Sequence, residues 1–212
     1  MSYILSILPQ LALGFLTSIE VFIITLIISI PLGVLFAYLL RLPVVKWIMN
    51  LYVWVMRGTP LILQIILIYY GLPTIGIIIQ NRLAAVLIAF VLNYAAYFAE
   101  IFRGGIAAIP AGQYEAAKVL RLNNWQANRL IILPQVTKIV LPSVMNEVIN
   151  LVKDSSLVYI VGVGDLMLAA WTALNRDQSM AALYLAGLFY LIFIGILTLA
   201  SRYIERRFNF YK

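Results

Sequence analysis

The chain has 212 residues, of which 64% are hydrophobic and only 11% are charged, whereas about a quarter of the residues of a soluble domain carry a charge. It contains no Cys and no His, which excludes disulfides, Cys/His zinc sites and catalytic arrangements built on either residue. It also lacks the Gly-x-x-x-x-Gly-Lys-Ser/Thr sequence of a P-loop. The net charge of +7 does not indicate a nucleic-acid partner, because basic residues in a membrane chain mark its cytoplasmic segments.

Apolar residues run in long blocks, and about 20 such residues, each rising about 1.5 Å, are enough to cross a bilayer. The first block covers residues 11–40, and we expect it to be a retained span rather than a cleaved signal. The second covers residues 44–70 and is broken by Arg-Gly-Thr-Pro at 57–60, and the third covers residues 83–102. Each block predicts one membrane-spanning helix.

A polar stretch, residues 104–129, separates the third block from the fourth, which covers residues 130–154. The apolar residues 157–163 are too few to cross a bilayer and are predicted to be re-entrant or interfacial. The fifth block covers residues 180–204 and leads into a basic tail. The sequence therefore predicts an all-α polytopic membrane protein of one domain, residues 1–212, with five transmembrane helices.

The distribution of Lys and Arg predicts the orientation of the chain. With the N-terminus outside, the outer segments hold only Arg82 and Arg176, whereas the inner segments hold ten basic residues. These ten are Arg41, Lys46, Arg103, Lys118, Arg121, Arg129, Arg202, Arg206, Arg207 and Lys212. Such a bias places the polar stretch and the C-terminus in the cytoplasm. Because the sequence has no internal repeat, a two-fold transport pathway needs a second permease subunit.

The polar stretch predicts two short helices outside the bilayer. Pro110 and Gly112 fit a turn, and the residues from Glu115 onward are strong helix formers. Asn123 is followed three residues later by Gln126, which suits a capping box at the start of a second helix. From this pattern alone, an amphipathic hairpin lying in the membrane interface is an equal alternative to a docking element.

The sequence Glu115-Ala116-Ala117, with the Ile-Ile-Leu-Pro that follows at 131–134, resembles the "EAA" coupling loop of bacterial ABC-importer permeases. Five further segments resemble the polar-amino-acid uptake branch of that family. They are RGTPL at 57–61, AEIFRGGI at 99–106, IP at 109–110 with GQ at 112–113, LPQ at 133–135 and KDSSL at 153–157. The resemblance extends over residues 10–205, nearly the whole chain.

One residue departs from the family pattern. The family usually has Gly four residues after the second Ala of the loop, whereas this chain has Arg121. Because Asn adopts positive φ more readily than Arg, we expect the turn to be shifted onto Asn123 or Asn124.

The resemblance implies that the loop docks in a cleft of a cytoplasmic ATPase dimer, and that this separate chain binds the ATP and Mg. The residues assigned to this coupling are Gly112, Glu115, Ala116, Ala117 and Arg121. Glu115 is expected to supply a charge contact and a favourable charge at a helix N-terminus, and the two alanines permit close approach. The resemblance also implies a second permease subunit, an extracellular solute-binding protein, a bacterial inner-membrane location, and no cofactor or covalent chemistry in this chain.

Polar and ionisable groups inside spans are costly, so each is a candidate for substrate contact. Arg57 lies at the break of the second span, where Thr59 is predicted to cap the following half-helix with Pro60 at its first position. This arrangement directs backbone N–H groups toward the middle of the membrane, where they suit a carboxylate.

Asn93 in the third span, with Glu147 and Asn150 in the fourth, completes the predicted substrate site. Together with Arg57 these residues suit a zwitterion, because Glu147 can meet an α-ammonium or a cationic side chain. Arginine, lysine and histidine are favoured, while glutamine, glutamate and cystine stay open. The alternatives are a structural ion pair of Arg57 with Glu147 or Glu100, an Arg-Gly-Thr-Pro segment that serves only as a kink, and asparagines that only join neighbouring helices.

Three other functions compete with an ABC-importer permease. An ion-coupled secondary amino-acid carrier would show internal symmetry or an acidic or His relay through its spans. An intramembrane enzyme would need a catalytic constellation, and the scattered carboxylates form none. A structural scaffold would leave the coupling-loop sequence unexplained.

Overall fold

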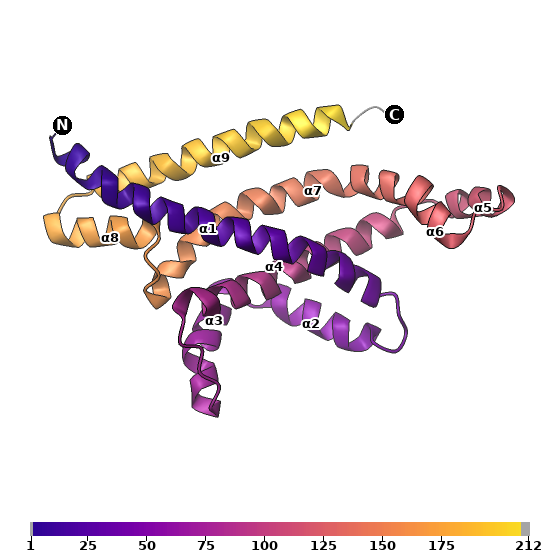
Figure 1. The fold of residues 1–212 in the computed structure, drawn as a ribbon, viewed down its shortest axis with the longest axis horizontal. Coiled ribbons are helices and arrows are strands. Elements are labelled where there is room, and N and C mark those ends of the chain that lie inside the picture. Colours follow the sequence, from indigo (N-terminus) through magenta and orange to yellow (C-terminus); the bar gives the residue numbers. More distant parts are fainter. Residues whose placement is uncertain (1, 209–212) are drawn as a thin grey trace.

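The computed structural model describes residues 2–208, which form helices and no strand. Four long helices run along the long axis of the molecule (Figure 1). They are α1 (Ser2–Leu39), α4 (Arg82–Ala107), α7 (Leu133–Asp154) and α9 (Ala181–Arg207). The predicted all-α class is therefore confirmed.

Shorter helical segments join the long ones. Between α1 and α4 lie α2 (Lys46–Gly58), α3 (Leu61–Ile66), the π-helix η1 (Leu67–Gly71) and the 3₁₀ helix η2 (Leu72–Ile75). Between α4 and α7 lie α5 (Ala111–Val119), α6 (Asn124–Ala127) and the π-helix η3 (Asn128–Ile132). Between α7 and α9 lie the 3₁₀ helix η4 (Ser155–Val161) and α8 (Leu166–Asp177).

Three of the described helices are long and apolar enough to cross a membrane by themselves: Tyr3–Leu39, Arg82–Ala107 and Ala181–Arg207. Two bent pairs meet the same test of length and composition. Lys46–Gly58 with Leu61–Ile75 bends by 106°, and Asn124–Val161 with Leu166–Asp177 bends by 55°. Counting each bent pair as one span gives the five spans that the sequence predicts, and residues 57–60 lie at the sharper bend.

Two boundaries differ from the prediction. The first helix begins at Ser2 rather than at residue 11, because Pro9 is accommodated inside α1 and does not end it. Residues 157–163 were predicted to be a separate re-entrant or interfacial segment. Up to Val161 they instead belong to η4, which continues directly from the end of α7. The twelve-residue helix α8 that follows was not predicted, since it is shorter than a span.

The core of the molecule lies between α1 and α4, which form the most extensive helix contact. Phe90, Tyr94 and Phe98 of α4 are almost fully buried against this core. Gly33 of α1 packs directly on the backbone of α4 at Phe98 and Ala99. Small residues let helix backbones approach closely inside a membrane, so Gly33 sets the spacing of the pair.

A second close contact joins α1 to the start of α8. Asp165 is fully buried, and its carboxylate accepts hydrogen bonds from the backbone N–H groups of Met167 and Leu168, each at 3.0 Å, so that it caps α8. Ser18 Oγ accepts from the N–H of Leu166 at 3.2 Å. A Cβ built on Gly14 would lie 2.6 Å from the carbonyl oxygen of Asp165, so only glycine fits there.

Replacing Gly14 with Ala is therefore expected to destabilise the protein by about 1–3 kcal/mol, the usual effect of overpacking a close contact. Thermal unfolding of the detergent-solubilised chain, followed by Trp fluorescence, measures this change. Gly195→Ala is the matched control, because a Cβ at Gly195 of α9 meets nothing within 4 Å and alanine favours a helix. Equal stability of the two variants would contradict the packing argument.

The two ends of the molecule differ in charge. The α5–α6 hairpin, the α1–α2 connection and the C-terminal end of α9 lie at one end, here called the hairpin end, and the N-terminus and α8 lie at the other (Figure 1). The basic residues assigned to the inner side belong to segments at or near the hairpin end, apart from Lys212, which lies outside the described residues.

Candidate functional site

The break between α2 and α3 is built by Pro60 and stabilised by a buried glutamine. Pro60, at φ −62° and ψ 136°, is the N-cap of α3, and no side chain caps this helix. The prediction that Thr59 caps α3 is therefore wrong: its hydroxyl instead donates to the carbonyl of Val55 at 2.8 Å and accepts from Gln64 Nε2 at 2.8 Å. Since α3 has only six residues before the π-helix, a helix-end charge contributes little here.

Gln64 was missed by the sequence analysis, although it organises the break. Its Nε2 donates to the carbonyl of Met56 at 3.0 Å, and its Oε1 accepts from Asn93 Nδ2 at 3.0 Å. Asn93 Nδ2 also donates to the carbonyl of Met56 at 2.9 Å. These two buried amides satisfy the backbone that the break leaves unpaired and tie it to α4. The rule applied to Asn93, that an amide inside a span is a candidate site, could have identified Gln64.

A cavity of about 680 Å³ lies beside this break, between α4, α7 and the α2–α3 junction. All five residues predicted to contact substrate line it. They are Arg57 and Thr59 at the break, Asn93 on α4, and Glu147 and Asn150 on α7. The sequence analysis did not single out Tyr94, Tyr97, Lys153 and Asp154 for this site, and these residues line it as well.

The cavity wall carries two cations, Arg57 and Lys153, and two carboxylates, Glu147 and Asp154. Glu147 and Asp154 are seven residues apart on α7 and share one helix face. Asp154 accepts a hydrogen bond from Tyr94 OH at 2.7 Å. The cavity therefore offers balanced charge at separate points, which is the arrangement that a zwitterion requires.

Arg57 does not form the structural ion pair that was its alternative role. Its guanidinium lies 5.3 Å from the ring centroid of Tyr97, in a cation–π contact. Glu100 pairs instead with Arg103, at 2.5 and 2.8 Å. Within residues 2–208, neither Glu147 nor Glu100 lies within ion-pair distance of Arg57, so its guanidinium keeps N–H donors for a ligand.

No metal site accompanies this cavity in the part of the chain that the structure describes. Residues 2–208 contain no group of three His, Cys, Asp or Glu side chains placed to hold a metal ion.

The second candidate site is the hairpin of α5 and α6. Helix α5 begins at Ala111, behind Pro110 as its N-cap, so Gly112 lies in the first turn and Glu115 in the second. The predicted stabilisation of the helix N-terminus by Glu115 is therefore weak, because that effect falls off within the first turn. Glu115 and Ala116 are exposed, whereas Ala117 is 1% exposed and packs inside the hairpin.

Helix α5 ends in a Schellman motif with Arg121 in the left-handed region. The N–H of Arg121 donates to the carbonyl of Lys118 at 2.9 Å, and the N–H of Leu122 donates to the carbonyl of Ala117 at 3.0 Å. Arg121 has φ +56°, whereas Asn123 has φ −71°. The expected shift of the turn to Asn123 or Asn124 is wrong, because Arg121 adopts the conformation that a glycine would favour. The capping box of Asn123 and Gln126 is confirmed.

Substituting Gly for Arg121 is expected to stabilise the hairpin by about 1 kcal/mol, since a left-handed residue with a Cβ costs about 1–2 kcal/mol. Hydrogen exchange of residues 111–127 should slow by roughly fivefold. Arg129→Gly, at a helical position of η3, is the control and should accelerate exchange. Faster exchange in Arg121→Gly would show that the Arg121 side chain stabilises the loop.

Helices that span a membrane, a charged cavity at the break of one span, and a helical hairpin at one end of the molecule together define the membrane component of a transporter. Residues 29–210 match the family described as "Binding-protein-dependent transport system inner membrane component". The chain belongs to this family.

Named relatives are similar in sequence over nearly their whole length. The arginine transport system permease protein ArtQ of Bacillus subtilis (strain 168) is 36% identical over 204 residues, covering 94% of this chain and 92% of the relative. The probable amino-acid ABC transporter permease protein PatM of Vibrio harveyi is 35% identical over 216 residues, covering 98% and 96%. The resemblance identified from the coupling loop is thus confirmed.

Solved structures of two amino-acid transporters share this fold. A chain of a crystal structure of an amino acid ABC transporter with histidines superposes with a TM-score of 0.89 at 29% identity, covering 96% of both chains. An inward-facing MetNI methionine ABC transporter shares the fold, with a TM-score of 0.73 at 19% identity. Nothing in these matches supports the ion-coupled secondary carrier that the sequence left open.

Proposed function

We propose that this chain imports polar amino acids, with the zwitterion bound in the cavity beside the α2–α3 break. Its transport cycle alternates access between the two sides of the membrane. The energy comes from an ATPase dimer that binds ATP and Mg in separate chains. A second, identical or homologous permease subunit completes the pathway, and an extracellular solute-binding protein delivers the substrate.

The observation that carries this proposal is the balance of charge in the cavity. Arg57 offers its guanidinium to an α-carboxylate, and Glu147 on the facing α7 offers a carboxylate to an α-ammonium or to a cationic side chain. Asp154 adds a second negative group, which favours substrates with a cationic side chain. ArtQ is named as an arginine permease, and the solved transporter was crystallised with histidines, which agrees with a preference for cationic amino acids.

The hairpin suits the role of the ATPase-docking element. Three large apolar side chains project from it into solvent: Val119 is 83% exposed, Leu120 68% and Trp125 63%. Exposed apolar groups of this size, grouped with a charge such as Glu115, are typical of a surface that a partner covers. Because the hairpin lies beyond the ends of the spans (Figure 1), the partner is expected outside the bilayer.

The proposed orientation places the hairpin end in the cytoplasm of a bacterial cell and the N-terminus outside. The concentration of Arg and Lys in segments at the hairpin end supports it, because short cytoplasmic segments of membrane proteins are enriched in these residues. Labelling of single introduced cysteines with a membrane-impermeant maleimide tests it. Gln178→Cys should react in intact cells and Lys118→Cys only after lysis; the reverse pattern would overturn the orientation.

Reconstitution tests the function. The chain is co-purified with the ATPase encoded beside it and placed in lipid discs, and the binding protein is added with each of the twenty amino acids or cystine. Stimulation of ATP hydrolysis by a group of amino acids, strongest for cationic ones, is the expected result. A stable complex without stimulation by any amino acid would overturn the substrate class, and no complex at all would overturn the docking assignment.

A further inference from the structure

We propose that a second cavity, at the hairpin end, binds the phosphate headgroup of an anionic lipid from the cytoplasmic leaflet. This basic cavity, of about 770 Å³, lies between α2, the inner end of α4 and the α1–α2 connection. Its lining includes four cations and one carboxylate. They are Arg41, Lys46, Arg57, Arg103 and Glu100, of which Arg57 also lines the cavity beside the α2–α3 break.

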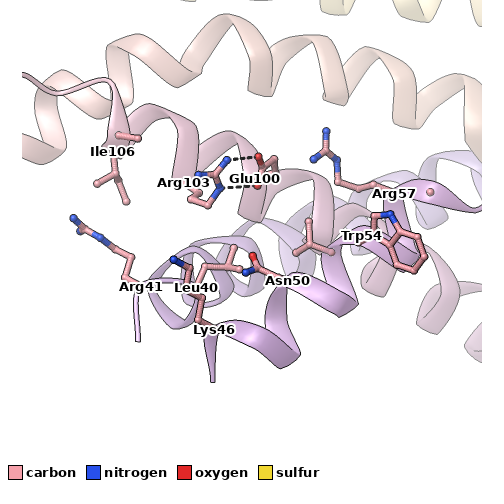
Figure 2. A pocket seen from close by; sticks show the side chains of 12 residues that line it. Leu40, Arg41, Lys46, Asn50, Trp54, Arg57, Glu100, Arg103 and Ile106 are labelled. Atoms are coloured by element: carbon pink, nitrogen blue, oxygen red, sulfur yellow. Dashed lines mark hydrogen bonds and ion pairs between the residues drawn. The ribbon is translucent and has the colours of Figure 1, made fainter. Parts of the chain in front are cut away.

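Two of these cations, Arg41 and Lys46, have no ion-pair partner within residues 2–208. The only carboxylate of the lining, Glu100, accepts two hydrogen bonds from Arg103. Figure 2 shows Arg41 and Lys46 at the same end of the cavity as Arg103. An anion placed there would meet the unneutralised charges of Arg41 and Lys46, on either side of the α1–α2 connection.

Apart from Asn50 and Gly58 the remaining lining is apolar, and this apolar part distinguishes the cavity from a site for a free ion. Leu40, Val53 and Ile106 form part of its wall together with Trp54, whose side chain is 72% exposed. Farther along α2, Trp47 is 75% exposed. This arrangement suits a lipid: the cations can bind its phosphate at the membrane surface, and the apolar wall can contact its acyl chains. Tryptophan is also enriched at this level of a membrane.

The depth of the cavity agrees with this ligand. It opens where α1 ends and α2 begins, so the charges of Arg41 and Lys46 lie at one end of two spans. Basic pockets between transmembrane helices on the cytoplasmic side commonly bind cardiolipin and related headgroups. The inference rests on the proposed orientation, which the cysteine-labelling experiment tests separately.

Native mass spectrometry of the assembled transporter, titrated with cardiolipin or with phosphatidylcholine, tests the proposal. Cardiolipin should be retained and phosphatidylcholine should not. In the double variant Arg41→Gln/Lys46→Gln the apparent affinity for cardiolipin should fall about 25-fold, roughly fivefold for each basic residue removed. The charge-preserving double variant Arg41→Lys/Lys46→Arg should retain the lipid, which shows that a loss is not caused by misfolding.

The matched control is Arg206→Gln/Arg207→Gln, which removes two charges from the C-terminal end of α9, outside this cavity. It should leave cardiolipin binding unchanged. An equal loss of cardiolipin binding in Arg41→Gln/Lys46→Gln and in Arg206→Gln/Arg207→Gln would indicate non-specific attraction and would overturn the proposal. Displacement of the lipid by millimolar inorganic phosphate would also overturn the proposal. So would lipid binding that is seen with the isolated chain but lost in the assembled transporter, because a second subunit would then fill the cavity.

Discussion

Charge reversal of Glu115 is expected to separate ATP hydrolysis from uptake. In proteoliposomes that contain the Glu115→Arg variant with its ATPase and loaded binding protein, uptake should fall roughly 30-fold or more, since a like-charge contact at an interface costs several kcal/mol. Residual hydrolysis should no longer respond to the binding protein. The side chain is exposed on α5, so the variant is expected to fold normally.

Glu205→Arg provides the control for this experiment. It makes the same charge reversal near the C-terminal end of α9, where Glu205 accepts a hydrogen bond from Ser201 at 2.9 Å. Uptake by this control should stay within about fivefold of the unmodified transporter, because a partly exposed hydrogen bond contributes only about 1 kcal/mol. Coupled uptake that persists unchanged in Glu115→Arg would exclude α5 as the element that meets the ATPase.

Loss of the carboxylate at Glu147 is the second large effect that we expect. In Glu147→Gln, uptake at low substrate concentration should fall roughly 10- to 100-fold, because a hydrogen bond to a charged group contributes about 1.5–3 kcal/mol. The loss should be larger for arginine or lysine than for glutamine, whose side chain carries no charge. Initial uptake rates in proteoliposomes measure this difference directly.

Glu20→Gln is the matched control, since it removes one carboxylate from α1, where Glu20 is exposed and does not line the cavity. Arg57→Lys distinguishes the two ends of the substrate: it keeps the charge but loses the planar donors that bind a carboxylate at two points. It should therefore weaken uptake of all amino acids alike. Unchanged uptake in Glu147→Gln would remove the cavity from the transport pathway.

The spans and the hairpin could be predicted because their signals are local. Long apolar blocks marked the spans, and the spacing of Asn123 and Gln126 marked the start of α6. Helix α8 gave no such signal: it has twelve residues, and its position depends on the buried cap of Asp165 and the contact with Gly14. Interactions between residues about 150 positions apart, such as Ser18 with Leu166, leave no periodic pattern.

The candidate site was predictable to a similar degree. The rarity of charges in spans identified Arg57 and Glu147, which the fold brings to one cavity. The hydrogen-bond partners were not predictable, because they depend on which backbone groups the break exposes. Thus Thr59 turns back to Val55, and Gln64 supplies the amide that pairs with Asn93. At Arg121 the local conformational preference failed, because the two hydrogen bonds that close α5 hold this residue at positive φ.

Helix α7 begins directly after the hairpin segment η3 and ends at Asp154, beyond Glu147 and Asn150 of the cavity. Helix α7, about 33 Å long with Pro142 in its interior, therefore connects the proposed ATPase-docking hairpin to the proposed substrate cavity. Since side-chain atoms lie about 5–6 Å from a helix axis, a twist of about 20° moves them about 2 Å. That movement is enough to break the 2.7 Å hydrogen bond between Tyr94 and Asp154, so a small rotation at the hairpin can release the Asp154 carboxylate in the proposed substrate cavity.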